Sequence, residues 1–307
     1  MSQKKIRIRS KGLVVNQILS KTDDATTASV MGVASHGLYI QIDRHWVIFL
    51  SYDNYRGPLT LNLEADKALL REIDHNSPVD IRKGIIDFTG TGIQINHSDA
   101  VLWDSRRGDN APLSLIESNA RIRAVGEEIY RQRKDVGFAS FLPILLGFDP
   151  SEAQQSLASF GGLDFEKLQM ATRQADISIL VMEMSRILGL GMGLTPSGDD
   201  LLVGFLIALN RYPDVLNPTF DLSQLNSAIV RMAYQKTSLL SANLIECASL
   251  GQANERLTQA LDGIMAGSLT PGRCVELILG WGNSSGVDTF VGFALAAYQR
   301  PDEDLDS

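Results

Sequence analysis

The feature that most constrains this chain is a glycine-rich stretch, Gly189–Asn210, which reads GLGMGLTPSGDDLLVGFLIALN. Its alternate glycines, Gly189, Gly191 and Gly193, permit positive φ angles and close backbone approach. Pro196 fixes φ and lacks an N–H, so a helix cannot run smoothly through it. An apolar run with helical spacing follows. The stretch therefore predicts a helix, a glycine-rich loop and a second helix, with unpaired backbone N–H groups that could hold a ligand.

The glycine stretch has a partner further along the chain. Residues 187–191 (ILGLG) match 278–282 (ILGWG) at four of five positions, and after a shorter loop residues 197–205 (SGDDLLVGF) match 285–293 (SGVDTFVGF) at six of nine. Similar helix starts could produce the shared serine and aspartate. They would not produce the paired Gly204 and Gly292, because a glycine inside a helix costs about 1 kcal/mol relative to alanine. The repeat favours a duplicated helix–loop–helix unit whose helices pack closely, either against another element or against each other.

Two such loops would make an anion site, because helix N-termini present N–H groups and the positive end of a dipole. Hydroxyl groups beside them suit phosphate or carboxylate oxygens. No lysine follows the glycines, so this is not a P-loop, and Gly-x-Ser-x-Gly is absent, so it is not a nucleophile elbow. The substrate contacts predicted in the two loops are Gly191, Gly193, Thr195, Ser197, Gly198, Asp199, Ser284, Ser285 and Gly286.

Aspartates in both motifs narrow the choice of ligand. Asp200 and Asp288 recur at one register, and with Asp199 they would repel a bare phosphate. One reading is a divalent cation such as Mg²⁺ that bridges carboxylate and phosphate. The other is a ligand with an NH₂ end for the aspartates and an anionic end for the N–H groups. Ser197 and Asp199 could instead simply cap the helix that starts at about Leu201, and the other aspartates could do the same. The repetition makes Asp200 and Asp288 the candidate catalytic residues.

Residues 237–248 (TSLLSANLIECA) place polar side chains within an otherwise apolar helical pattern. Thr237 can cap a helix, whereas Ser241 and Asn243 interrupt an apolar pattern. Buried polar groups need partners, so these side chains either line the same cleft or lie on an exposed face. Thr237 and Ser241 complete the predicted substrate contacts.

The pattern predicts an α+β chain with two domains. Residues 1–110 are rich in alternating apolar residues and should form a barrel- or sandwich-like β domain, with the boundary in the polar segment 104–112. Residues 111–307 should form an all-α domain that carries the duplicated unit. Expected strands include 13–19 and a hairpin of 37–42 with 46–52. The expected helices are 115–133, 151–160, 165–188, about 201–210, 222–234, 238–250, 255–266, 273–279 and 288–298, with a frayed acidic tail at 301–307.

Composition excludes several classes of function. A net charge of −8 argues against a nucleic-acid footprint, which needs a basic patch. No apolar run approaches the roughly 18 residues of a membrane helix. The basic N-terminus has no apolar segment behind it, so we expect no signal peptide, a cytoplasmic location and free thiols at Cys247 and Cys274. The histidines match no metal motif; they are His36, His45, His75 and His97.

These motifs resemble a known family. GLGMGLTPSGDDLLVGF, the later GNSSGVD and the intervening T-x-x-x-S helix are similar to AllH, a subunit associated with oxamate carbamoyltransferase in allantoin (purine) catabolism. The resemblance implies transfer of a carbamoyl group between oxamate, or a similar ureido compound, and phosphate. It also implies partner subunits in a multisubunit complex. In that family the second loop often carries histidine where this chain has Asn283.

The implied substrates suit the predicted site, because carbamoyl phosphate and oxamate each combine an anionic end with an NH₂ group. The glycine loops would hold the oxyanion, and the aspartates would orient the NH₂ group or bind metal. No evident nucleophile is present, so catalysis would rest on positioning and electrostatics. Two alternatives remain. One is a non-catalytic assembly subunit that uses the glycine loops as a packing interface. The other is a metal-dependent hydrolase or kinase-like phosphate enzyme.

Overall fold

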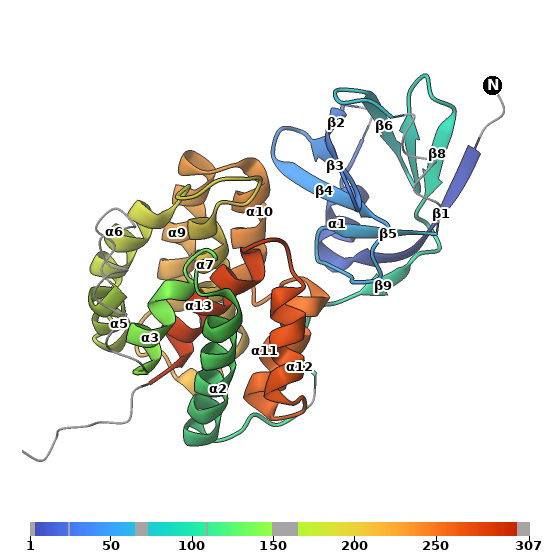
Figure 1. Cartoon of the computed structure of the whole chain (residues 1–307). Coiled ribbons are helices and arrows are strands. Elements are labelled where there is room, and N and C mark those ends of the chain that lie inside the picture. The colour runs from blue at the N-terminus through green and yellow to red at the C-terminus, as the bar shows by residue number, and fades with distance from the viewer. Residues whose placement is uncertain (1–3, 24, 65–72, 109, 149–164, 300–307) are drawn as a thin grey trace, which may run out of the picture. The chain divides into compact units, whose positions relative to one another are not determined.

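The structure is a computed structural model that describes residues 4–23, 25–64, 73–108, 110–148 and 165–299. The contacts divide the chain into two compact units (Figure 1). The first comprises Met1–Arg106 with Ala253–Glu255, and the second comprises Arg107–Gln252 with Arg256–Ser307. The first is built mainly of strands and the second of helices, as the sequence predicts for an α+β chain.

The strands of the first unit close into a barrel. Eight strands follow the order β5-β4-β3-β2-β6-β7-β8-β1, and β1 pairs back with β5 in an antiparallel register to complete the ring. β9 adds to the end of β1 in parallel. The strands are β1 (Lys4–Gly12), β2 (Ala28–Ala34), β3 (Gly37–Ile42), β4 (Trp46–Ser51), β5 (Thr60–Glu64), β6 (Pro78–Arg82), β7 (Ile85–Phe88), β8 (Ile93–Asn96) and β9 (Val101–Trp103). A closed ring leaves few unpaired edges, and the alternating apolar residues fill its interior.

Local pattern explains most of the barrel. In β1, Ile6 and Ile8 are buried between exposed charged residues, as the period of two requires. The predicted hairpin between β3 and β4 is present, and Asp43 and Arg44 turn the chain with φ angles of 48° and 55°. Two consecutive positive φ angles are typical of the tight turns that join antiparallel strands.

The predicted strand at residues 13–19 is wrong, because this segment is helix α1 (Leu13–Ser20). Its buried residues are Val14, Val15, Ile18 and Leu19. They form two pairs with a spacing of four, which places all of them on one helical face. β-Branched residues suggested a strand, but burial of this single face determined the outcome.

The second unit has helices and no strand among its described residues. Its helices are α2 (Leu115–Arg133), η2 (Ala139–Phe141), α3 (Leu142–Leu146), α5 (Phe165–Arg173), α6 (Ile177–Ile187), α7 (Ser197–Arg211), α8 (Pro213–Leu216), α9 (Leu222–Lys236), α10 (Leu239–Ala248), α11 (Glu255–Ala266), α12 (Pro271–Leu279) and α13 (Ser285–Ala297). Figure 1 shows α7 and α13 in the middle of the unit, and both are buried along almost their whole length. These two helices are the core on which the others pack.

The sequence predicted one continuous helix at 165–188. This prediction is wrong in one respect, because the segment forms two helices, α5 and α6. Ala175 adopts a φ of 57°, and the Asp176 side chain accepts a hydrogen bond from Ile179 N–H as the N-cap of α6. A capping aspartate gives the backbone an alternative to continuing the first helix. The helix predicted at 151–160 and the tail at 301–307 lie outside the described residues.

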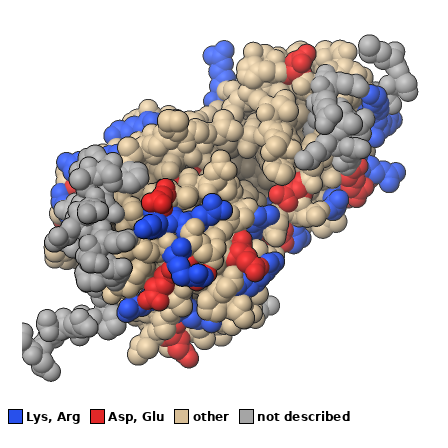
Figure 2. Space-filling model, viewed as in Figure 1, with Lys and Arg blue, Asp and Glu red and all other residues tan. Residues whose placement is uncertain are grey.

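Charged side chains on the helical unit are mixed in sign. Figure 2 shows Lys and Arg interspersed with Asp and Glu on the face in view. Along α2, Arg123 pairs with Glu127 at 2.9 Å, and Arg131 pairs with Glu128 at 2.5 Å. Among the described residues, none of the helices has the length and apolar character needed to span a membrane.

Candidate functional site

The two repeated helices, α7 and α13, cross at their interior glycines. A Cβ atom on Gly204 would lie 1.8 Å from the carbonyl oxygen of Thr289, and one on Gly292 would lie 1.8 Å from that of Leu201. Real Cβ atoms do not approach this closely, so only glycine permits the contact. The prediction that these helices pack closely is confirmed, and the partner of each helix is the other.

The loops that lead into the two helices also share one geometry. Gly198 N–H donates to the carbonyl of Leu190 at 2.8 Å, and Gly286 N–H donates to that of Trp281 at 2.9 Å. A Cβ on Gly198 would lie 1.9 Å from the carbonyl oxygen of Ile187, and a Cβ on Gly286 would lie 1.9 Å from that of Ile278. The duplicated unit therefore repeats in its backbone contacts as well as in its sequence. These two N–H groups are used within the chain, so they are not the anion donors that the sequence suggested.

Asp200 lies at the base of the site, in the first turn of α7. Its Oδ2 accepts a hydrogen bond from the Thr195 hydroxyl at 3.2 Å, and the Thr195 and Ser285 hydroxyls lie 3.3 Å apart. Burial raises the pKa of Asp200 to about 8, and the nearby charge of Asp288 raises it further, whereas hydrogen bonding to Ser285 opposes the shift. Asp200 therefore carries a proton in neutral solution, unlike an ordinary aspartate.

Asp288, its equivalent in α13, is fully buried. Its Oδ1 accepts a hydrogen bond from Phe138 N–H at 2.7 Å, while its Oδ2 has no hydrogen-bond partner. Burial raises the pKa of Asp288, and the Phe138 N–H and the hydroxyls of Ser197 and Ser284 oppose that shift. Neither of these hydroxyls makes a hydrogen bond to Oδ2.

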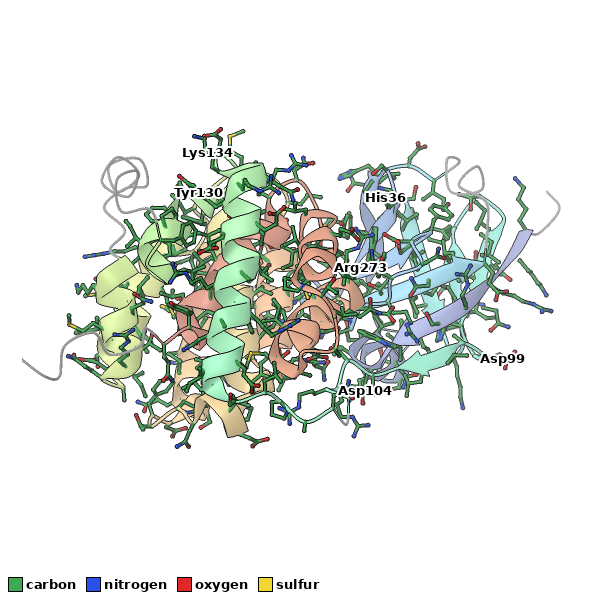
Figure 3. All side chains as sticks on the ribbon, turned by 60° about the horizontal axis from the view of Figure 1, so that its bottom comes forward. His36, Asp99, Asp104, Tyr130, Lys134 and Arg273 are labelled. Atoms are coloured by element: carbon green, nitrogen blue, oxygen red, sulfur yellow. The ribbon has the colours of Figure 1, made fainter. Side chains whose placement is uncertain are left out.

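The contact between Asp288 and Phe138 was not foreseen from the sequence. Lys134, labelled in Figure 3, ends α2, and the chain then turns through Gly137 with a φ of 51°. A Cβ on Gly137 would lie 2.0 Å from Asp288 Oδ1, so the backbone wraps closely around this carboxylate. The only local signal was a glycine before a short apolar segment, which says nothing about a partner 150 residues away.

The N-termini of the two repeated helices adjoin. The hydroxyl of Thr195, just before α7, lies 3.3 Å from that of Ser285 in α13. The serine at the start of each helix also lowers the pKa of the aspartate in the other, Ser285 that of Asp200 and Ser197 that of Asp288. Both carboxylates are buried, whereas the serines and Thr195 are half-buried at the rim. The structure thus brings together five of the residues that the sequence singled out, with Ser284 beside them.

Asp199 does not cap its own helix, although the sequence made it a candidate. The N-cap of α7 is Pro196, without a side-chain hydrogen bond, so Ser197 does not cap it either. Instead, the Asp199 carboxylate accepts from Gly189 N–H at 2.8 Å and from the Thr237 hydroxyl. Asp199 therefore fastens the glycine loop to the start of α10.

The α10 segment differs from its prediction in two ways. Thr237 does not cap α10, because Ser238 accepts the hydrogen bond from Ser241 N–H. Ser241 and Asn243 are buried, which excludes the exposed face that the pattern left open. Asn243 donates to the Tyr234 hydroxyl at 2.9 Å, while Ser241 Oγ has no hydrogen-bond partner. The Ser241 hydroxyl therefore makes no hydrogen bond to Asp200 or Asp288.

The tip of the glycine loop is exposed. Gly191 and Gly193 have φ angles of 117° and 104°, which favour glycine at both positions. A Cβ on Gly191 would also lie 2.7 Å from Ser197 N, whereas one on Gly193 would meet nothing within 4 Å. Gly191 therefore shapes the start of α7, and Gly193 serves the turn alone.

Other candidate groups lie away from this site. Among the described residues, no group of three or more His, Cys, Asp or Glu side chains is placed to hold a metal ion. His97, in the barrel, is buried, and both ring nitrogens lack partners. Burial and the nearby charge of Lys11 lower its pKa to about 4, so it is neutral. Cys247 and Cys274 are buried free thiols.

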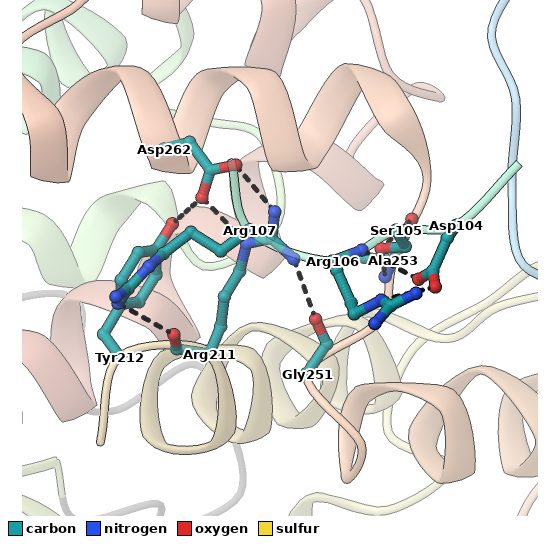
Figure 4. Close-up of polar contacts among 9 residues, drawn as sticks. All are labelled: Asp104, Ser105, Arg106, Arg107, Arg211, Tyr212, Gly251, Ala253 and Asp262. Carbon is teal, nitrogen blue, oxygen red and sulfur yellow. Dashed lines mark hydrogen bonds and ion pairs between the residues drawn. The ribbon is translucent and has the colours of Figure 1, made fainter. Parts of the chain in front are cut away.

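Sequence reasoning missed a second buried polar cluster in the helical unit (Figure 4). Arg211 binds Asp262 through Nε at 2.8 Å and Nη2 at 2.6 Å, and the Tyr212 hydroxyl donates to Asp262 at 2.6 Å. Arg107 lies over the Tyr212 ring at 5.9 Å, beside a cavity of about 70 Å³. Because these charges satisfy one another, the cluster is structural and joins α7 to α11.

The geometry defines a class of protein: an α+β chain with a duplicated helix–loop–helix unit, whose two helix N-termini meet over a pair of buried carboxyl groups. A family model described as oxamate carbamoyltransferase subunit AllH matches residues 187–297. The match begins at the end of α6 and runs through both glycine loops to the end of α13, so it confirms the resemblance drawn from the motifs. Neither curated proteins nor solved structures gave a match.

Proposed function

We propose that this chain is a subunit of a carbamoyltransferase that moves a carbamoyl group between oxamate, or a related ureido compound, and phosphate. The proposal places the reaction in the breakdown of allantoin, a purine product. The observation that carries it is the meeting of the two repeated helix N-termini, where the Thr195 and Ser285 hydroxyls lie 3.3 Å apart and Thr195 donates to the buried Asp200 at 3.2 Å. The match to a family named for this activity supports it.

The chemistry of the site suits a carbamoyl group. Asp288 Oδ2 is a buried acceptor without a donor, and leaving such a group unpaired is unfavourable. The NH₂ of a carbamoyl or amide group is a donor of the right kind. Half-buried hydroxyls of Thr195, Ser197 and Ser284 can bind the carboxylate or phosphate oxygens of the same ligand, with the dipoles of two helices in support. This division of roles favours the NH₂-bearing ligand over a bare phosphate.

Ligand binding to the isolated chain is the direct test. Melting temperature is measured with carbamoyl phosphate, oxamate and inorganic phosphate, each with and without Mg²⁺, because a specific ligand stabilises the folded state by mass action. We expect carbamoyl phosphate and oxamate to raise the melting temperature of the wild type and to lose most of that effect in Asp288→Asn. No shift with any of these ligands would contradict the proposal.

The Mg²⁺ arm tests the metal-dependent alternative. A shift that appears only with Mg²⁺ and is equally large for phosphate would favour a phosphate-handling enzyme that uses the aspartates as ligands. A shift that is independent of Mg²⁺ and specific to carbamoyl or amide compounds would favour carbamoyl transfer.

A second candidate function is assembly, and one observation favours it. Met192 and Leu194 at the tip of the glycine loop are 93% and 55% exposed. Exposed apolar residues beside a site are typical of a surface that another protein covers. Replacing both by serine should weaken association with partner subunits while leaving the ligand-induced shift of the isolated chain intact. Loss of the shift with normal assembly would instead assign the tip to ligand binding.

A further inference from the structure

We propose that Arg256 is a positioning residue of the candidate site, which holds the second glycine loop where Ser285 meets Thr195 of the first. The arginine supplies an anchor that the first loop has within the repeat and the second loop lacks. Its effect on ligand binding rests on the proposed function, whereas its effect on the loop does not.

The first glycine loop is anchored by an aspartate of the repeat. The Asp199 carboxylate accepts a hydrogen bond from Gly189 N–H at 2.8 Å. Gly189 and Gly280 are equivalent residues of the two ILG sequences, but the equivalent of Asp199 in the second motif is Val287. An aliphatic side chain cannot accept a hydrogen bond, so the second loop needs a different anchor.

The second loop has that anchor in Arg256, in the first turn of α11. Its Nη1 donates to the carbonyl of Gly280, the residue that ends α12 as its C-cap. Carbonyl groups at a helix C-terminus lack intrahelical donors and lie at the negative end of the helix dipole, so a guanidinium suits this place. An acidic side chain thus holds the glycine of the first loop through its N–H, and a basic one holds the glycine of the second through its carbonyl.

The lack of a side chain at Gly280 admits the arginine. The φ angle of Gly280 is −80°, which any residue can adopt. A Cβ at this position would lie 2.3 Å from Arg256 Nη1, so a side chain would displace the guanidinium. Its equivalent, Gly189, has a φ of 76° and is favoured there for its backbone angle instead. The two equivalent glycines therefore serve different purposes, and that of Gly280 is the contact with Arg256.

Short contacts connect the anchored glycine with the site. The next residue, Trp281, accepts a hydrogen bond from Gly286 N–H at 2.9 Å, at the start of α13. A Cβ on Gly282 would lie 2.9 Å from the Ser285 hydroxyl oxygen, so the loop backbone packs directly against this hydroxyl. The same hydroxyl lies 3.3 Å from that of Thr195 in the first loop. A loop that shifts at its anchor would therefore move Ser285 relative to Thr195.

Trp281 can report the position of the second loop. The full chain is labelled with 5-fluorotryptophan, and the fluorine resonance of Trp281 is identified by its absence in Trp281→Phe. Arg256→Met has a similar length but no donor, and we expect it to shift or broaden that resonance without any ligand. Arg256 is half-buried, so water can take the place of the lost donor and the variant should fold. Trp46 and Trp103, in the barrel, should keep their resonances. An unchanged Trp281 resonance would overturn the proposal.

Arg256→Lys separates the hydrogen bond from the bulk of the side chain. Lysine keeps a charged donor on a flexible stem, so the Trp281 resonance should stay close to that of the wild type. Arg273→Met is the matched control, because Arg273, labelled in Figure 3, lies on α12 and pairs at the surface with Glu276 at 2.7 Å. It should leave the resonance in place. If lysine or the control disturbs the resonance as much as Arg256→Met does, the role of the Arg256 hydrogen bond is overturned.

Ligand binding tests the consequence for the site. Dissociation constants of carbamoyl phosphate and oxamate are measured calorimetrically on the full chain. Arg256→Met should raise both by about 3- to 10-fold, the loss expected when one hydrogen bond to the ligand is poorly placed. Arg256→Lys and Arg273→Met should change them little. Unchanged constants in Arg256→Met would overturn the positioning role even if the Trp281 resonance shifts.

The two proposals fail in different ways. If neither compound binds the wild type, the proposed function fails, and the Trp281 resonance still decides whether Arg256 holds the loop. If both compounds bind the wild type, and Arg256→Met changes neither the resonance nor the dissociation constants, the proposed function stands and the role of Arg256 is overturned.

Discussion

Gly204 and Gly292 are equivalent residues of the repeat, and each occupies the place where the backbone of the opposite helix passes. A Cβ on either would lie 1.8 Å from a carbonyl oxygen of the facing helix. The same crossing brings the N-termini of α7 and α13 together, as the 3.3 Å separation of the Thr195 and Ser285 hydroxyls shows. The packing of the two glycines therefore determines the distance between the two halves of the candidate site.

Alanine at Gly204 or at Gly292 should destabilise the helical unit. Overpacking a filled core typically costs about 1–3 kcal/mol, occasionally more, and here the added methyl group meets backbone that cannot rotate away. Denaturant unfolding measures the change. Gly272→Ala is the matched control, because a Cβ at that position in α12 meets nothing within 4 Å. If Gly204→Ala is as stable as Gly272→Ala, then α7 and α13 do not pack closely enough at Gly204 to exclude a methyl group.

Removing the Thr237 hydroxyl should loosen the glycine loop from α10. Thr237→Val keeps the shape of the side chain but leaves one oxygen of the buried Asp199 without its donor. An acceptor left unpaired in this way costs about 1–3 kcal/mol. Thr237→Ser retains the hydroxyl and should remain close to the wild type in the same unfolding experiment. If valine and serine are equally stable, the Asp199–Thr237 bond contributes nothing measurable.

The stability of the wild type should fall as pH rises through the range in which Asp200 titrates. Its pKa rises from 3.8 to about 8 on folding, so the folded state holds a proton that the unfolded state has released. The stabilisation from this proton is complete below the unfolded pKa and is lost as pH rises through the folded pKa. Asp200→Asn should remove this part of the pH dependence, as measured by unfolding at several pH values between those limits.

Asp221 is the control of opposite sign for the pH experiment. It caps α9, and hydrogen bonds to Ser223 and Gln224 lower its pKa. Its contribution is therefore present above the unfolded pKa and is lost as pH falls. Asp221→Asn should alter the acid side of the stability profile only. Suppose that Asp221→Asn also flattens the dependence of stability on pH between the unfolded and the folded pKa of Asp200. The effect would then not come from Asp200.

Breaking the Arg211–Asp262 pair should be among the more damaging single changes in the helical unit. Asp262→Asn leaves the buried Arg211 guanidinium without its charged partner, and breaking a buried pair typically costs about 3–5 kcal/mol. The hydrogen bond from Arg211 to the Gly251 carbonyl remains, so we expect the lower end of this range. Tyr212→Phe, which removes one neutral donor to Asp262, should cost about 1 kcal/mol. The two losses should differ clearly in denaturant unfolding.

Much of the fold follows from local pattern. Alternation predicted the β3–β4 hairpin, and helical spacing predicted α2 and α11 with their observed ends. The repeat carried information beyond single elements, because a glycine inside each of two similar helices indicated close packing before any contact was known. Local pattern was misleading at residues 13–19, where β-branched residues lie on a buried helical face. It also missed the break at Ala175, where a capping aspartate outweighs helical periodicity.

The candidate site, like the fold, could be predicted only in part from the sequence. The sequence by itself determined which residue types gather at the two helix N-termini, since the glycines, serines and aspartates recur at one register. Only the tertiary structure decided the surroundings of each carboxylate. Asp199 and Asp288 have partners from distant segments, Thr237 and Phe138, and the Thr195 hydroxyl that donates to Asp200 also lies beside Ser285 of the other repeat. Burial and hydrogen-bond donors control the protonation of a carboxyl group. Both are properties of the packed molecule, so two residues that are equivalent in the sequence have different hydrogen-bond partners in the structure.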